Sequence, residues 1–270
     1  MLPSSVAVKS TAKDSLKGVW PAAITVGVLL TLTYYFGMFL SELVKAVVPF
    51  NDTAVTIVTL AVYLLVLYIP LFLGALRWFW CITAKKPYDK KEVFTYFSSP
   101  KKYFRTIGFT LSLLVRLFFC ALAAFFPAII AGVLSAPWFY SLLNFTMPMW
   151  SANLPVVANF LEVIGLILFV FLSLRFYLSG LLLVIDDDMH PGEAFYISGL
   201  ISRDFLMNFI ILLFSFFGWI LISLFAVPLI FTLPLFIASF TVHGRFAINY
   251  YNTKVNRWQQ DNYVAFKEHV

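Results

Sequence analysis

The chain has 270 residues, of which 61% are hydrophobic and 12% are charged, and its formal net charge is +6. Soluble domains hold roughly 45 to 50% apolar and about 25% charged residues, so this composition excludes a soluble globule and predicts lipid as the solvent for most of the chain. The basic residues interleave with aromatic residues typical of a bilayer edge, which argues against nucleic-acid binding. Cys81 and Cys120 provide no disulfide framework.

The first apolar run follows a polar N-terminal segment at residues 1–17 and extends over 19–48. A signal peptide has an apolar region of about 7 to 15 residues, so this longer run is predicted to be a retained first crossing. A second crossing is predicted at 54–76. It ends in an aromatic and basic belt that begins at Arg77, as expected where a helix meets the membrane interface.

A lysine-rich segment follows at 77–105 and holds eight of the nineteen Lys and Arg residues. Such an excess of positive charge is typical of a cytoplasmic loop. Its lysines interleave with Phe and Tyr, which favours contact with anionic lipid headgroups; a plain topology signal is the alternative. The candidate headgroup contacts are Lys85, Lys86, Lys90, Lys91, Lys101 and Lys102.

The later crossings alternate across the bilayer. Residues 135–159 carry no charge, which indicates the translocated face. Residues 208–251 contain no Asp, Glu or Lys, and His243 and Arg245 are their only His and Arg. Because one crossing needs about 20 residues, this run is predicted to be two crossings joined by a turn near Val227-Pro228. The last four crossings are predicted at 107–134, 160–185, 208–226 and 228–250.

These crossings predict an all-α fold, a polytopic membrane helix bundle of six transmembrane helices. The chain is expected to form one membrane domain over 1–270, with both termini in the cytoplasm. Two cytoplasmic segments, 77–105 and 186–206, are predicted to be amphipathic and to lie in the membrane interface.

Two arginines lie deep in predicted crossings. Arg116 and Arg175 are each 11 residues from a cytoplasmic edge, which is about 16 Å along a straight helix. Each has a serine one turn away, Ser112 and Ser179, and together these groups could hold a phosphate or carboxylate. The alternative is structural, because a long arginine can reach the headgroups or cap a backbone carbonyl.

An acidic turn contains Asp186, Asp187, Asp188, His190 and Glu193. These residues could gather around a hard cation, but their spacing matches no EF-hand loop and zinc would require more His or Cys. The alternative is that the acids cap the following helix, whose first turn favours negative charge. We therefore expect neither a metal site nor a cofactor.

Several short motifs resemble one known family. They are Leu16-Lys-Gly-Val-Trp20, Pro70, Gly74, Phe94, Phe97, Pro127, Arg175-Phe-Tyr-Leu-Ser179, Ser198, Ser215-Phe-Phe-Gly-Trp219 and Pro234. From about Asp14 to Tyr251 the chain resembles the bacterial membrane family known as domain of unknown function 975, although the uncharged loop after the third crossing is longer than expected. The resemblance implies a six-helix bacterial membrane protein and implies no activity.

No Ser-His-Asp order, His-Glu-x-x-His motif or glycine-rich phosphate loop is present, so we expect no enzyme. The leading interpretation is a multi-pass protein of the bacterial cell membrane that binds or transports a small anionic solute or lipid. The alternative is a scaffold or regulatory protein that docks a protein partner through the two cytoplasmic segments. The expected partners are the bilayer with its anionic headgroups and a small anionic ligand or a protein.

Overall fold

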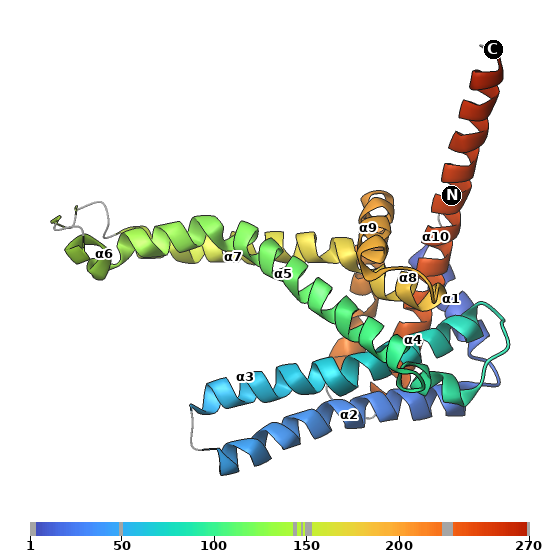
Figure 1. The fold of residues 1–270 in the computed structure, drawn as a ribbon, viewed down its shortest axis with the longest axis horizontal. Helices are drawn as coiled ribbons and strands as arrows, with labels where there is room; N and C mark the ends of the chain where they lie inside the picture. Colours follow the sequence, from blue (N-terminus) through green and yellow to red (C-terminus); the bar gives the residue numbers. More distant parts are fainter. Residues whose placement is uncertain are drawn as a thin grey trace. The chain divides into compact units, whose positions relative to one another are not determined.

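The computed structural model describes residues 4–48, 51–142, 145, 146, 148, 153–222 and 229–268, and within these ranges it is helical without a strand (Figure 1). Six helical stretches among them are long and apolar enough to cross a membrane, which confirms the predicted fold class. The helices are α1 (Ser5–Ser15), α2 (Trp20–Val47), α3 (Asp52–Tyr63), α4 (Ile69–Thr83), α5 (Pro100–Ser135), α6 (Pro137–Leu142), α7 (Leu154–Ser173), α8 (Ser179–Ile185), α9 (Pro191–Ile222) and α10 (Leu229–Glu268).

The chain divides into two compact units. The first unit contains Met1–Thr110 and Leu178–Val270, and the second contains Leu111–Tyr177. The single membrane domain predicted over 1–270 stays a prediction. The predicted orientation, with both termini in the cytoplasm, stays a prediction.

In the first unit, α2 and α3 form an antiparallel hairpin, drawn in blue and cyan in Figure 1. The Asn51 side chain caps α3 by accepting a hydrogen bond from the Ala54 N–H at 3.1 Å. Further along, the Tyr63 hydroxyl donates to the Thr33 carbonyl at 2.5 Å. The Tyr63 ring also packs on Gly37, where any side chain would overlap it. The hairpin is thus held at its turn and along its length.

The second predicted crossing is longer than 54–76, because α3 continues through a π-helical segment (Leu64–Tyr68) into α4 and ends at Thr83. Pro70 lacks an N–H and cannot bond the carbonyl of Val66, four residues earlier. The irregular π-helical turn lies just before this proline, and the Tyr103 hydroxyl donates to the Val66 carbonyl at 2.9 Å. The helix therefore accommodates its proline instead of ending there.

The expected amphipathic segment at 186–206 is not a separate element in the structure. From Pro191 onward it is the beginning of α9, which continues without a break into the predicted fifth crossing. Asp204, near the end of this expected segment, lies within α9 and pairs with Lys254 of α10 at 2.8 Å. The predicted turn at Val227-Pro228 lies outside the described residues.

Helices α9 and α10 pair through aromatic contacts. Phe205 contacts Tyr250 and Phe216 contacts Phe236, and in each pair the ring centroids are 5.3 Å apart. More than half of the α10 candidate span, 56%, is buried, against 11% for the span that contains α7. Helix α10 thus forms part of the protein interior, whereas α7 is suited to face lipid.

The N-terminal helix α1 packs on α10 and α9 and buries Val8 and Ala12. Lys9 donates to the Ser215 carbonyl at 3.2 Å and lies over the Phe216 ring. Trp20 at the start of α2 contacts Phe231 near the start of α10, with ring centroids 6.5 Å apart. Helices α2 and α10 therefore meet at their beginnings.

In the second unit, α7 packs against the later part of α5. Gly165 of α7 lies against Phe125, and a Cβ there would be 2.8 Å from the Phe125 ring. Small residues allow such close approach of helices in membranes. Large apolar side chains remain exposed, among them Phe118 at 63% and Phe160 at 66%. An apolar surface of this kind suits contact with lipid.

Trp150 of the predicted translocated loop lies outside the described residues.

Candidate functional site

The lysine-rich segment folds as the end of α4, a turn, and the short 3₁₀ helix η2 (Lys90–Phe97). Lys85 has φ of 55°, the left-handed conformation that often ends a helix. The Asp89 side chain then starts η2 by accepting a hydrogen bond from the Lys91 N–H at 3.2 Å. The predicted segment 77–105 is thus a turn and a short helix between two long helices, because α4 ends only at Thr83 and α5 already begins at Pro100.

Helix η2 is pinned to α4 by close packing. Gly74 of α4 lies directly under the Val93 carbonyl, where a Cβ would overlap that oxygen. Val93 and Tyr96 are 2% and 0% exposed, and Trp78 of α4 is also fully buried. The segment that carries the lysines is therefore a fixed part of the protein surface.

Five of the six candidate lysines are exposed: Lys85, Lys86, Lys90, Lys91 and Lys101. Large apolar rings are exposed between and beside them, with Phe94 at 51% and Phe104 at 68%. Exposed ammonium groups next to exposed rings suit a membrane interface, where rings insert and cations meet phosphates. The predicted contact with lipid headgroups itself stays a prediction.

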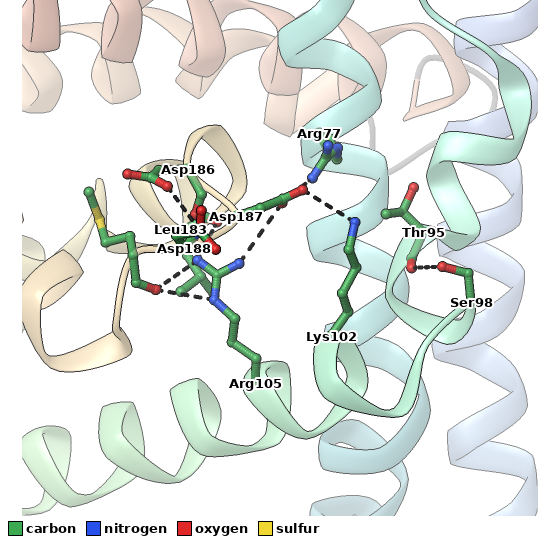
Figure 2. A network of polar contacts seen from close by, with 10 residues as sticks. Arg77, Thr95, Ser98, Lys102, Arg105, Leu183, Asp186, Asp187 and Asp188 are labelled. Atoms are coloured by element: carbon green, nitrogen blue, oxygen red, sulfur yellow. Dashed lines mark hydrogen bonds and ion pairs between the residues drawn. The ribbon is translucent and has the colours of Figure 1, made fainter.

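The sixth lysine belongs to a different arrangement, in which three basic side chains converge on Asp187 (Figure 2). Lys102 lies 3.2 Å and Arg105 4.0 Å from the Asp187 carboxylate, and Arg77 donates a hydrogen bond to it. The three cations come from α4 and α5, and the carboxylate comes from the acidic turn between α8 and α9. The cluster therefore ties the lysine-rich segment to a turn 110 residues after Arg77.

Arg105 also caps α8. Its guanidinium donates to the carbonyls of Leu183 at 3.1 Å and Met189 at 2.8 Å, and to that of Asp186. The last carbonyls of a helix have no partner within the helix, and cations are favourable at this end. Because the Arg105 side chain is only 12% exposed, these bonds fix the acidic turn in place.

The charges around Asp187 change its pKa. Partial burial alone would raise the pKa of Asp187, but the hydrogen bond and charge of Arg77, together with those of Lys102, outweigh burial and lower it below its ordinary value. Asp187 is therefore ionised over the physiological range. It neutralises cations that would otherwise repel one another.

The other groups of the acidic turn bond locally. The Asp186 carboxylate accepts from the Asp188 N–H at 2.9 Å, and His190 Nδ1 accepts from the Gly192 N–H at 3.2 Å. Thus His190, rather than one of the predicted acids, bonds the backbone in the first turn of α9. Within the described ranges, no three His, Cys, Asp or Glu side chains are placed to hold a metal ion.

The predicted anion-site residues have mixed environments. Arg116 is half-buried and donates to the Ser112 carbonyl at 3.1 Å and to the Ser112 hydroxyl, which is the local capping foreseen as the alternative. Arg175 is exposed in a short 3₁₀ turn (Leu174–Phe176) between α7 and α8. Ser179 is buried and belongs to the first unit, whereas the other three belong to the second. A joint anion site of these four residues stays a prediction.

Sequence reasoning missed the pairing of Asp187 with Arg77, Lys102 and Arg105. It placed all four on one side of the membrane, and their opposite charges were the available signal. What it lacked was the direction of each side chain, which depends on how α4, α5 and α8 pack.

No protein-family model, curated protein or solved structure matches this chain. The resemblance to the family known as domain of unknown function 975 therefore stays a prediction that depends on its short motifs. The function has to be argued from the described geometry.

Proposed function

We propose that this membrane protein is a non-enzymatic, multi-pass protein of the bacterial cell membrane that binds anionic lipid through its lysine-rich segment. The observation that supports the proposal is the set of five exposed lysines beside exposed phenylalanines, on a segment pinned to a candidate membrane span. Within the described chain, these five lysines form no ion pair. They are therefore available to an external anion.

The structure separates two kinds of basic group. Arg77, Lys102 and Arg105 share the carboxylate of Asp187 and serve the internal packing of the first unit. The exposed lysines carry the remaining charge of the segment. A basic residue near an anionic membrane surface contributes about 1 kcal/mol to attraction, so five of them give a marked preference for anionic over zwitterionic lipid.

The test is to replace Lys85, Lys86, Lys90, Lys91 and Lys101 together by Gln. Arg77, Lys102 and Arg105 stay in place and preserve the charge bias that orients the chain. We expect the purified variant, in mixed-lipid nanodiscs, to lose the enrichment of phosphatidylglycerol over phosphatidylcholine that mass spectrometry finds around the wild type. A control outside the segment replaces Lys13 and Lys17, of which Lys17 pairs with Asp14, by Gln and should keep that enrichment.

Unchanged enrichment in the five-lysine variant would contradict the proposal and leave partner docking as the role of the segment. The Arg116→Gln and Arg175→Gln variants form a further arm of the same experiment. Enrichment that depends on these arginines and not on the lysines would favour the anion site predicted from the sequence, and with it a transport role.

A further inference from the structure

A small apolar cavity lies between the first turns of α2 and helix η2. Its volume is about 150 Å³, and the residues that line it are Ala22, Thr25, Val26, Leu29, Lys90, Val93 and Phe94. Of these seven described residues, Lys90 alone carries a charge. The cavity opens to the surface, and its mainly apolar walls favour an apolar group over water.

The walls of the cavity are held by packing elsewhere. On the η2 side, Val93 is fixed by the contact of its carbonyl with Gly74. On the α2 side, Gly27 lies against the Pro234 ring of α10, where a Cβ would be 3.0 Å away. The cavity is therefore a property of the fold and not of one mobile side chain.

The charge and the apolar walls together select the occupant. Lys90 is exposed, lines the cavity and has no acidic partner in the described chain. A free inorganic anion would pair with Lys90 and gain nothing from the apolar walls. A neutral hydrocarbon would fill the walls and gain nothing from Lys90. Only an amphiphile with a negative head uses both.

The position in the chain favours a membrane lipid. Residues 22–29 lie within the first three turns of a candidate span that begins at Trp20, where an aromatic side chain marks the interface. At this depth the headgroup phosphate of a phospholipid lies beside the first carbons of its acyl chains. We propose that the cavity holds the upper part of one acyl chain of an anionic phospholipid, with its phosphate paired to Lys90.

This inference rests on the proposed function and adds one defined lipid site to the broader lysine surface. The test uses the full-length protein in nanodiscs that contain phosphatidylglycerol with a photoreactive diazirine in the upper acyl chain. After irradiation, mass spectrometry of the digested protein locates the labelled residues. We expect labels within residues 22–29 and at Val93 or Phe94.

Three variants sharpen the test. Lys90→Gln should lower labelling of the cavity about fivefold, the effect of one basic residue at an anionic surface. Ala22→Phe should fill the cavity and abolish the labels. Lys101→Gln removes the same charge from an exposed residue that does not line the cavity, and it should leave the labels unchanged.

The outcomes separate the two proposals. If the wild type enriches phosphatidylglycerol through its lysines but carries no label in the cavity, the cavity inference is wrong and the proposed function stands. Labels that are equally strong with a phosphatidylcholine probe, and unaffected by Lys90→Gln, would also overturn the inference. If the wild type shows no enrichment of anionic lipid, the proposed function itself fails.

Discussion

At the scale of single residues, Asp187 brings together three basic side chains that would repel one another without it. Arg105 extends this role by joining the same carboxylate to the Leu183 carbonyl near the end of α8 and to the Met189 carbonyl of the acidic turn. The basic residues of the lysine-rich segment therefore fall into two groups. Three of them interact with Asp187 inside the first unit, and the exposed lysines remain available to external anions.

We expect Asp187→Asn to lower the free energy of unfolding by about 1 kcal/mol at neutral pH, because the ion pairs are partly exposed and screened by solvent. The control is Asp188→Asn, which changes an exposed neighbour that forms no ion pair in the described chain. Thermal unfolding in detergent micelles measures both variants. Equal stability of wild type and Asp187→Asn at pH 7 would contradict this role.

The ion pairs of Asp187 make the free energy of unfolding depend on pH, and the direction of this dependence follows from the pKa of Asp187. The folded pKa of Asp187 is lower than its ordinary value of 3.8. The stabilisation is therefore complete above that ordinary value and is lost as the pH falls through the lowered folded pKa. The stability difference between wild type and Asp187→Asn should accordingly be constant from pH 7 to about pH 5 and disappear under strongly acidic conditions.

At the scale of elements, η2 owes its position to one glycine. The Val93 carbonyl occupies the place where a side chain at position 74 would be, so the lysines and one wall of the cavity are set by the sequence of α4. The π-helical turn before Pro70 also contributes to this packing, because its Val66 carbonyl accepts a hydrogen bond from the Tyr103 hydroxyl of α5. Helices α4, η2 and α5 thus form one packed group.

Gly74→Ala should push η2 away from α4, at a cost of about 1 to 3 kcal/mol for an overpacked contact. It should also weaken labelling of the lipid cavity, because Val93 lines it. The matched control is Gly108→Ala in α5, where an added Cβ would meet nothing within 4 Å, and which should be neutral or slightly stabilising. Unfolding temperature and cavity labelling are measured together. A Gly74→Ala protein as stable as the control would show that η2 is not pinned there.

At the scale of the whole molecule, the two units bury their apolar helices to different extents. The first unit encloses much of α10, whereas the second exposes most of α7. A helix that is largely enclosed by protein is apolar because its side chains form part of the protein core. A helix that is largely exposed is apolar because lipid surrounds it. Hydropathy along the chain does not distinguish these two reasons.

The predicted orientation is tested by cysteine labelling from outside intact cells. Cys81 and Cys120 are first replaced by Ser, and a single cysteine is then placed at Lys101 or at Trp150. We expect a membrane-impermeant maleimide to label position 150 and to label position 101 only after permeabilisation, because the lysine-rich segment is predicted to be cytoplasmic. The opposite pattern would overturn the orientation and the assignment of both loops.

The helix ends show how far sequence reasoning extends. The second crossing was expected to end at 76 and its helix ends at Thr83, and the third was expected to begin at 107 and its helix begins at Pro100. The expected cytoplasmic segment at 186–206 is the beginning of α9. In each case polar residues were taken to end a helix, although a helix that leaves the membrane can continue where its polar side chains find water or partners such as Asp204 with Lys254.

The sequence by itself determined that the protein is all-α, that it belongs to a membrane and that six of its helices are apolar and long enough to cross. The reason is local: in lipid every backbone polar group must be satisfied within its own segment, so a run of about 20 apolar residues is sufficient evidence for a helix. Only the tertiary structure decided which cations meet Asp187, that η2 lies on Gly74 and that a cavity opens beside Lys90. These features depend on side-chain directions and on contacts between distant segments, which no local pattern contains.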